Sequence, residues 1–274
     1  MSRIDDAFAQ LRADKRTGLI TYTTAGDPDL PLSRDVLLAL AHAGADLLEV
    51  GIPFSDPLAD GPVIQRATER ALAAGSTLTR VLELVADVRA RVATPIVLFT
   101  YVNPLHRMGF ATFAREAAAA GADGVLALDL PIEEAGEFRD LLANHDLDTI
   151  FLLSPTTTTE RIKRAAALSL GFLYGISRLG VTGARDTVSV DAAAMVARIR
   201  NETNMPVAVG FGVSHPDHVS EIGRYADAAV VGSSLVNVVA RHGQADTLVT
   251  AVDAYVRWLK GTIPVEQAAG AGPW

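Results

Sequence analysis

At residues 43–62 the chain reads AGADLLEVGIPFSDPLADGP, and the first half of this stretch decides the fold. Small residues and a glycine end a helix, and an apolar run of strand length begins directly after Asp46. The pattern recurs as AGADGVLA at residues 120–127 and more loosely as YADAAVV at residues 225–231. This partial repeat predicts a fold built from alternating helices and strands.

Short apolar runs bounded by Gly, Pro, Asn or Asp predict eight strands. They lie near residues 18–25, 47–52, 96–102, 124–130, 149–153, 171–176, 206–211 and 228–232. Amphipathic segments predict helices near residues 31–43, 62–74, 78–92, 110–120, 133–144, 159–168, 189–200, 215–222 and 244–260. We expect Ser33 and Ser214 to cap helix N-termini, and Gly44, Gly75 and Gly121 to follow helix C-termini.

The strands are almost continuously apolar, which is typical of a parallel sheet covered by helices on both sides. Eight strand–helix units in 274 residues predict an α/β fold, a single (β/α)8 TIM barrel. Extra helices are expected at the N-terminus and after the second and eighth strands. A doubly wound open sheet is the alternative, but near-equal units fit closure better. We expect one domain over residues 1–274, with a loose tail at 267–274.

Composition excludes several classes of protein and partner. The net charge of −8, without a Lys/Arg run, argues against nucleic acid or an anionic membrane as partner. The absence of cysteine excludes disulfides and thiolate metal sites. Residues 1–15 lack the apolar core of a signal peptide, and no apolar run is long enough to cross a bilayer. We therefore expect a cytoplasmic protein.

Three carboxylates mark the second strand and the loop after it. Glu49 lies among apolar strand residues, where a carboxylate is costly unless something satisfies or uses it. Asp56 and Asp60 follow in the loop, and carboxylates in different environments can differ in pKa and act as acid and base. Barrel enzymes react at the carboxyl ends of their strands, which Glu49 and Asp60 can both reach. Three structural alternatives stay open: a hydrogen-bonded Glu49 inside the barrel, Asp60 as a helix N-cap, and Asp56-Pro57 as a simple turn.

Glycines after the seventh and eighth strands predict an anion site. GFGVS at 210–214 and VGSSL at 231–235 combine glycines with the start of an apolar helical segment. Glycine lets backbone approach a ligand closely, and the N–H groups of a helix N-terminus bind anions. Phosphate sites in barrels commonly use these two loops. The alternative is that the glycines only make tight turns.

The loop after the sixth strand, residues 177–185, has two glycines among polar residues and predicts a mobile lid. Tyr174 could place a phenol in the barrel mouth or could be a core aromatic. His215 and His218 flank Pro216 and Asp217 at a helix start, and we interpret them as surface residues. No His/Glu cluster has metal-ligand spacing, so no metal site is expected.

Five segments resemble the signatures of the tryptophan synthase α subunit family. They are YTTAGDP at 22–28, LLEVGIPFSDPLADGP at 47–62, SRLGVTG at 177–183, GFGVS at 210–214 and GSS at 232–234. The resemblance runs in order across nearly the whole chain, to about residue 260, and the segment at 47–62 is its most specific part. It implies cleavage of indole-3-glycerol phosphate to indole and glyceraldehyde 3-phosphate, without a cofactor.

The resemblance also implies roles for single residues. Glu49 matches the catalytic acid and base, and Asp60 matches the carboxylate that faces the indole N–H. Tyr174 matches a tyrosine that lines the site, and Tyr22 stands in the indole pocket where Phe is expected. Thr182 matches a lid threonine that approaches Asp60. The residues that match the phosphate-binding backbone are Gly183, Gly212, Gly232 and Ser233.

A partner is implied as well. Pro53 and Asp56 match the loop that faces a tryptophan synthase β subunit, which would receive indole in an α2β2 heterotetramer. Leu179 is bulkier than the residue expected in the lid. Three alternatives remain: a stand-alone lyase that releases free indole, a phosphate-binding isomerase or synthase on the same barrel, and a regulatory barrel without catalysis. Intact Glu49 and Asp60 argue against the last, and the strand-2 Glu argues against the second.

Overall fold

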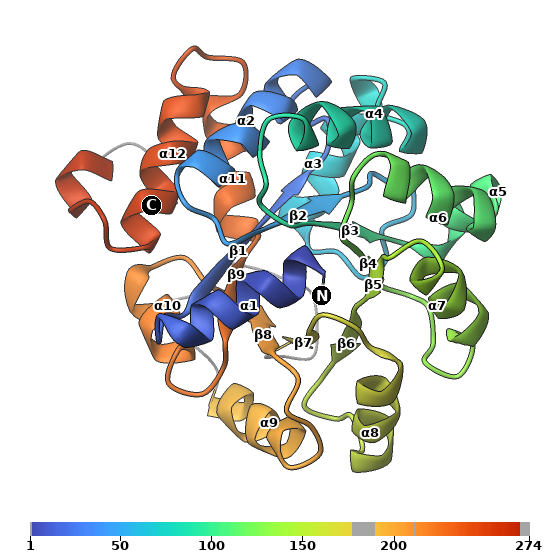
Figure 1. Ribbon diagram of the computed structural model, residues 1–274. Helices are drawn as coiled ribbons and strands as arrows, with labels where there is room; N and C mark the ends of the chain where they lie inside the picture. The colour runs from blue at the N-terminus through green and yellow to red at the C-terminus, as the bar shows by residue number, and fades with distance from the viewer. Residues whose placement is uncertain (1, 177–189, 211, 269–274) are drawn as a thin grey trace.

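The computed structural model describes residues 2–176, 190–210 and 212–268 of the chain. In this part, parallel strands lie at the centre and helices surround them (Figure 1). The strands are β1 (Gly18–Thr24), β2 (Leu47–Gly51), β3 (Ile96–Thr100), β4 (Gly124–Ala127), β5 (Asp148–Thr149), β6 (Phe151–Leu153), β7 (Leu173–Ile176), β8 (Val207–Gly210) and β9 (Ala228–Val231). They form one sheet in the order β5-β4-β3-β2-β1-β9-β8-β7-β6.

The helices follow the strands as the sequence predicts, with two additions, at residues 102–108 and 265–268. They are α1 (Arg3–Ala13), α2 (Leu30–His42), α3 (Pro62–Ala73), α4 (Leu78–Arg89), α5 (Val102–Met108), α6 (Phe110–Ala119), α7 (Gly136–Ala143), α8 (Thr159–Leu168), α9 (Val190–Arg200), α10 (Pro216–Ile222), α11 (Ser233–His242), α12 (Leu248–Leu259) and the 3-10 helix η1 (Val265–Ala268). The extra helices expected at the N-terminus and after the second and eighth strands are α1, α3 or α4, and α11 or α12. No helix in the described ranges is long and apolar enough to cross a membrane.

The sheet closes into a barrel through one short segment of chain. β5 pairs with β4, β6 pairs with β7, and only Ile150 separates β5 from β6. The single strand expected at 149–153 is therefore divided in two, because its first part follows one neighbour and its second part the other. The two pieces together take the fifth place of a (β/α)8 barrel, and the open-sheet alternative is wrong.

Several expected boundaries differ from the structure. The strand expected to reach residue 102 ends at Thr100, and α5 begins at Val102, whose N–H donates to Asp129 Oδ1 at 2.7 Å. The N-cap of α2 is Asp29, which accepts from Leu32 N–H at 2.8 Å, and not Ser33. Ser33 Oγ instead accepts from Gly26 N–H at 3.0 Å.

Other terminal predictions have mixed outcomes. Gly44, Gly75 and Gly121 follow helix C-caps with φ of 97°, 83° and 83°, a left-handed conformation that favours glycine, so their prediction is confirmed. The N-cap of α10 is His215 and not Ser214. The first residues of the expected loose tail, 267 and 268, belong to η1, where Ala268 is buried. Residues 269–274 lie outside the described part.

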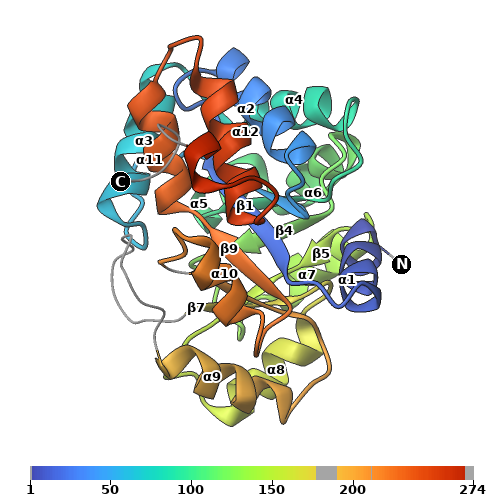
Figure 2. The ribbon, with the colours of Figure 1, turned by 90° about the vertical axis from the view of Figure 1, so that its left-hand side faces the viewer.

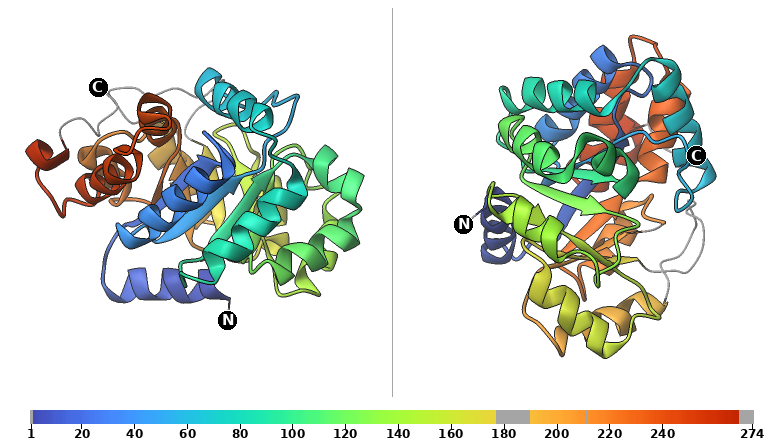
Figure 3. Two further views of the ribbon diagram at one scale, coloured as in Figure 1. Left: turned by 90° about the horizontal axis from the view of Figure 1, so that it is seen from above. Right: turned by 90° about the vertical axis from the view of Figure 1, so that its right-hand side faces the viewer.

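Inside the barrel, buried side chains from the strands pack together in one apolar cluster. α1 lies across the amino-terminal end of the strands (Figures 2 and 3). Its buried Ile4, Phe8 and Leu11 join a cluster with strand residues such as Ile20 and Leu47. Because this end is plugged, any pocket inside the barrel must open at the carboxyl ends of the strands.

The repeated aspartates share one structural task at the plugged end. Asp46, Asp123 and Asp227 each precede a strand and accept a backbone N–H from the first or second residue of a neighbouring strand. The donors are Leu19 at 2.8 Å, Ile96 at 2.7 Å and Val207 at 2.7 Å, respectively. These contacts pin β1 to β2, β3 to β4, and β8 to β9.

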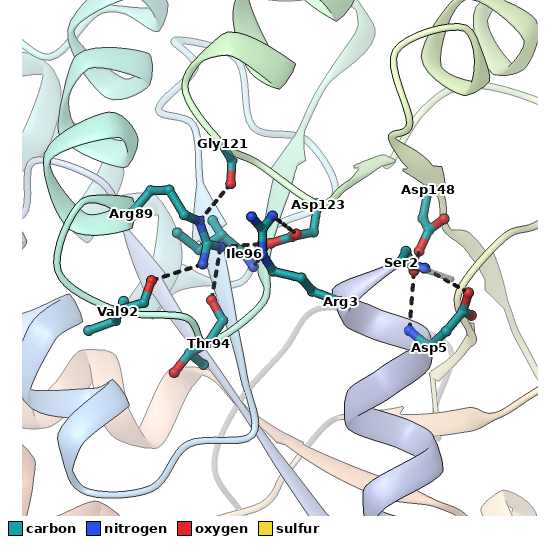
Figure 4. A network of polar contacts seen from close by, with 10 residues as sticks. All are labelled: Ser2, Arg3, Asp5, Arg89, Val92, Thr94, Ile96, Gly121, Asp123 and Asp148. Carbon is teal, nitrogen blue, oxygen red and sulfur yellow. Dashed lines mark hydrogen bonds and ion pairs between the residues drawn. The ribbon is translucent and has the colours of Figure 1, made fainter.

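Arginine side chains complete the clamp around Asp123 (Figure 4). Arg89 Nη2 donates to Asp123 Oδ2 at 2.7 Å, and Arg3 Nη1 donates to Asp123 Oδ1 at 2.8 Å. The neighbouring Ser2 Oγ donates to Asp148 Oδ2 at 2.6 Å. Through Ser2 and Arg3, the start of α1 is fastened to two different strands.

Candidate active site

Glu49 lies in the middle of β2 and points into the barrel. It pairs with Tyr22 on one side and Val97 on the other, and only 1% of its surface is exposed. Its Oε1 atom has no hydrogen-bond partner among the described residues. Burial raises the pKa of Glu49 to about 8, because the charged form is poorly solvated. The unpartnered oxygen argues against a purely structural, hydrogen-bonded carboxylate, and the raised pKa lets Glu49 hold a proton at neutral pH.

Asp60 lies at the end of the loop between β2 and α3. The N-cap of α3 is Gly61, and no side chain caps this helix, so the interpretation of Asp60 as a helix cap is wrong. Burial raises the pKa of Asp60 to about 6, and a hydrogen-bonding interaction with Tyr101 opposes the rise. At neutral pH Asp60 is thus ionised, whereas Glu49 is protonated. One site therefore holds both a proton donor and a fixed negative charge.

A pocket of about 680 Å³ of empty space, partly open to solvent, brings these carboxylates together. Its lining includes both of them and the backbone near the ends of β8 and β9. The apolar lining side chains are Ile64, Phe99, Leu128, Leu152, Val213 and Val230. Sequence reasoning did not single these out. Phe99, Leu128 and Leu152 could have been found from strand alternation, since each lies two residues beyond an inward-facing residue of the barrel core.

Two tyrosines line the same pocket. Tyr22 and Tyr174 are 7% and 6% exposed. The Tyr22 ring meets Phe99 edge-on, with ring centroids 5.2 Å apart, and its hydroxyl lies 3.5 Å from Thr24 Oγ1. Burial holds the pKa of both phenols well above the usual value, and nearby carboxylates add to the effect. Tyr174 is thus both a buried core aromatic residue and a residue that lines the pocket, so the two roles considered for it are compatible.

The residues of the predicted anion site line the same pocket. Gly212, Gly232 and Ser233 all line it. α11 begins at Ser233 without a side-chain cap, and the first N–H groups of a helix have no partner within the helix. Gly212 has φ of 84°, a conformation that its tight turn requires. Gly212 can therefore both make the turn and offer its backbone to a ligand.

Other predicted residues lie apart from this pocket or outside the described ranges. Thr182, Gly183, Leu179 and the rest of the expected lid at 177–185 lie outside them. Pro53 is buried and Asp56 is exposed, and neither lines the pocket.

The histidine prediction is half wrong. His215 is exposed as expected, but His218 is only 8% exposed, because its Nδ1 accepts the Ser214 N–H at 3.2 Å and so holds the ring against the loop. In the described part of the chain, no group of three or more His, Asp or Glu side chains is arranged to hold a metal ion.

The geometry suits one kind of ligand. A neutral carboxylic acid and a carboxylate share an apolar pocket that fits a flat aromatic ring, and the start of α11 offers N–H groups to an anionic end. This arrangement can protonate a ring, stabilise the positive charge that results and hold a phosphate at a distance.

Comparisons with known proteins agree with this description. A protein named tryptophan synthase alpha chain from Geobacter sulfurreducens is 49% identical over 246 residues, which covers 90% of this chain and 93% of that one. Among solved structures, a Mycobacterium tuberculosis tryptophan synthase superposes with a TM-score of 0.88 at 38% identity, covering 95% of this chain and 97% of that one. A tryptophan synthase complex from Pyrococcus furiosus superposes with a TM-score of 0.81 at 38% identity, covering 89% and 98%.

The family model gives the same result over most of the sequence. The model for the tryptophan synthase alpha chain matches residues 8–263. That span contains every strand of the barrel and every residue of the pocket. The chain therefore belongs to the tryptophan synthase alpha chain family.

Proposed function

We propose that this chain cleaves indole-3-glycerol phosphate to indole and glyceraldehyde 3-phosphate, a carbon–carbon lyase reaction of tryptophan biosynthesis. The observation that carries the proposal is the joint presence of Glu49 and Asp60 in one apolar pocket whose other end is the start of α11. The indole ring fits between the apolar walls. The phosphate fits the backbone at Gly212, Gly232 and Ser233, and the family match implies that Thr182 and Gly183 complete the site.

The first step is protonation of the ring. The bond to be broken joins indole C3 to the glycerol chain, and a proton on C3 makes the ring an electron sink. Glu49 is the donor, because its pKa of about 8 keeps it protonated at neutral pH. Positive charge then develops at N1, where Asp60 stabilises it as an anion already fixed in place.

The second step breaks the carbon–carbon bond. Glu49, now a carboxylate, takes the proton from the hydroxyl of the carbon attached to C3. The oxygen's electron pair forms the aldehyde carbonyl, and the electrons of the broken bond return to the ring as indole. Glu49 recovers its proton, so the cycle is balanced without an added acid, base or cofactor.

The partner proposed for this chain is a tryptophan synthase β subunit, in an α2β2 heterotetramer. The Pyrococcus furiosus relative is described as a complex. In this chain, the loop before Asp60 carries the exposed Asp56 and Leu58, and the Leu58 side chain is 91% exposed. An exposed leucine near a carboxylate is suited to contact with a partner protein. Because this loop leads directly to Asp60, binding of the partner there can affect catalysis.

The test is release of indole by the purified chain, measured with and without a β subunit. We expect slow turnover alone and faster turnover in the complex, whereas fast turnover alone would favour a stand-alone lyase. Glu49→Gln should abolish cleavage while the circular dichroism spectrum stays native. Asp60→Asn should lower turnover with the fold intact. A folded chain that releases no indole under either condition would overturn the proposal.

A further inference from the structure

We propose that Tyr255, on α12, is a positioning residue for the phosphate end of the site, although it does not line the pocket. This inference rests on the proposed function, because it concerns the binding of that substrate's phosphate. α12 lies outside the barrel and packs against α10 and α11 (Figures 1 and 2). The Tyr255 hydroxyl reaches from this outer helix to the loop after β8.

The contacts of Tyr255 are specific. The residue is fully buried, and its hydroxyl donates to the carbonyl oxygen of Ser214 at 3.2 Å. Burial raises the pKa of Tyr255, and the neighbouring side chain of Ser234 opposes the rise. Ser234 is the second residue of α11 and, like Ser233, lines the pocket.

Ser234 connects the two halves of the anion site. Its Oγ donates to the carbonyl oxygen of Val213 at 2.6 Å. The loop after β8 therefore has two consecutive carbonyls, Val213 and Ser214, held by hydroxyls from α11 and α12. This loop also carries Gly212, which lines the pocket at the phosphate end.

The arrangement matters because backbone N–H groups cannot adjust as side chains do. A phosphate held by N–H groups from two loops requires both loops in fixed relative positions. The Tyr255 hydroxyl holds the Ser214 carbonyl and the Ser234 hydroxyl holds the adjacent Val213 carbonyl, so together they fix the loop after β8 against α12 and the start of α11. The Tyr255 ring packs beside Trp258, with centroids 5.8 Å apart, and that packing survives when only the hydroxyl is removed.

The experiment compares Tyr255→Phe with the wild-type chain in steady-state cleavage. Loss of one buried hydrogen bond predicts a KM for indole-3-glycerol phosphate raised about threefold to tenfold, with kcat within about twofold. Calorimetry should show the same loss of affinity for glycerol 3-phosphate. The affinity for indole, which has no phosphate, should stay unchanged, and a generally loosened structure would not give this split.

The chain offers a matched control. Tyr225 has a buried hydroxyl without a hydrogen-bond partner among the described residues, and it does not line the pocket. Tyr225→Phe should therefore leave both affinities at the wild-type level. Ser234→Ala removes the hydroxyl that holds the adjacent Val213 carbonyl of the same loop, so combining it with Tyr255→Phe should cost less than the two single effects together.

The outcomes separate the two proposals. A Tyr255→Phe variant with wild-type KM and wild-type glycerol 3-phosphate affinity would overturn the positioning role, as would equal losses of indole and phosphate affinity. If the wild-type chain does not cleave the substrate, the proposed function fails. In that case, the affinity for glycerol 3-phosphate still shows whether Tyr255 positions the phosphate site.

Discussion

A Cβ atom on Gly51 would lie 2.3 Å from the hydroxyl oxygen of Tyr22, so the ring of Tyr22 crosses β2 where only glycine leaves room. Tyr22 pairs with Glu49, two residues before Gly51. Tyr174 repeats the arrangement on the other side of the barrel. It pairs with Ala208, and a Cβ on Gly210 would lie 2.4 Å from its hydroxyl. Each pocket tyrosine is thus seated over a glycine of the next strand.

Gly51→Ala should push Tyr22 into the pocket. We expect kcat/KM to fall at least about tenfold, and overpacking to destabilise the fold by about 1–3 kcal/mol. Adding Tyr22→Leu should recover stability, whereas Tyr22→Phe should not, because the ring atoms Cζ and Cε2 would still lie 2.7 and 2.9 Å from the new Cβ. Thermal unfolding and indole release measure the two effects. Equal rescue by Phe and Leu would contradict the steric explanation.

The two carboxylates predict a bell-shaped pH profile. kcat/KM should rise as pH passes about 6, where Asp60 ionises, and fall as pH passes about 8, where Glu49 loses its proton. The substrate phosphate also titrates near pH 6, so Asp60→Asn is the control. If the Asp60 variant keeps the whole acid limb, that limb belongs to the substrate.

Glu49→Gln should change stability in a pH-dependent way. The pKa of Glu49 is raised in the folded state, so its stabilising contribution is present below pH 4.5 and is lost as pH rises toward about 8. Glutamine stays neutral, and the variant should exceed the wild type at pH 9 by on the order of 4 kcal/mol. Urea unfolding at pH 5 and pH 9 measures the difference. A constant offset at both pH values would show that Glu49 titrates normally.

Leu58→Ser should weaken association with the β subunit. Burial of one exposed leucine at an interface contributes about 1.5–3 kcal/mol, so Kd should rise by about tenfold or more. Val265→Ser is the matched control, because Val265 is also an exposed apolar residue, at 47%, but lies on η1. Titration of the two chains by calorimetry gives both constants. Unchanged affinity for the Leu58 variant would place the partner elsewhere.

Asp123→Ala should destabilise the barrel without changing the pH profile of catalysis. It leaves Arg89, whose side chain is only 14% exposed, without its carboxylate partner, and breaking such a pair costs about 3–5 kcal/mol. Asp87→Ala removes an exposed carboxylate that pairs with Arg91, and should cost less than about 1 kcal/mol. Chemical denaturation compares the two. Equal losses would mean that the clamp at Asp123 contributes no more than a surface ion pair.

The eight near-equal strand–helix units, supported by the partial repeat, were sufficient to predict the barrel. Local propensity could not predict where strands end, because tertiary contacts decide it. The strand at 149–153 breaks at Ile150 since its neighbours on the two sides diverge. The strand expected to reach residue 102 ends early and the unexpected helix α5 begins, because Asp129, which follows β4, accepts the Val102 N–H. Ser33 has the right residue type for an N-cap, but the helix begins earlier in the chain, and Asp29 is its N-cap.

The site residues could be predicted where their residue type differs from that of their neighbours in the sequence. A glutamate in an apolar strand is visible in sequence, as are glycines before a helix. The apolar walls were not, because Phe99 and Leu128 differ from core residues only in which layer of the barrel they occupy. The proposed role of Tyr255 was equally hidden, since its hydroxyl donates to a single backbone carbonyl, that of Ser214, 41 positions away.

The aspartate clamps at Asp46, Asp123 and Asp227 have a consequence for how this barrel can evolve. They fix the strand register at the end opposite the pocket, so register does not depend on the loops at the mouth. Insertions and substitutions in those loops can alter substrate preference without exchanging inward and outward side chains. The loops at the pocket can therefore change in sequence while the strand register of the barrel stays the same.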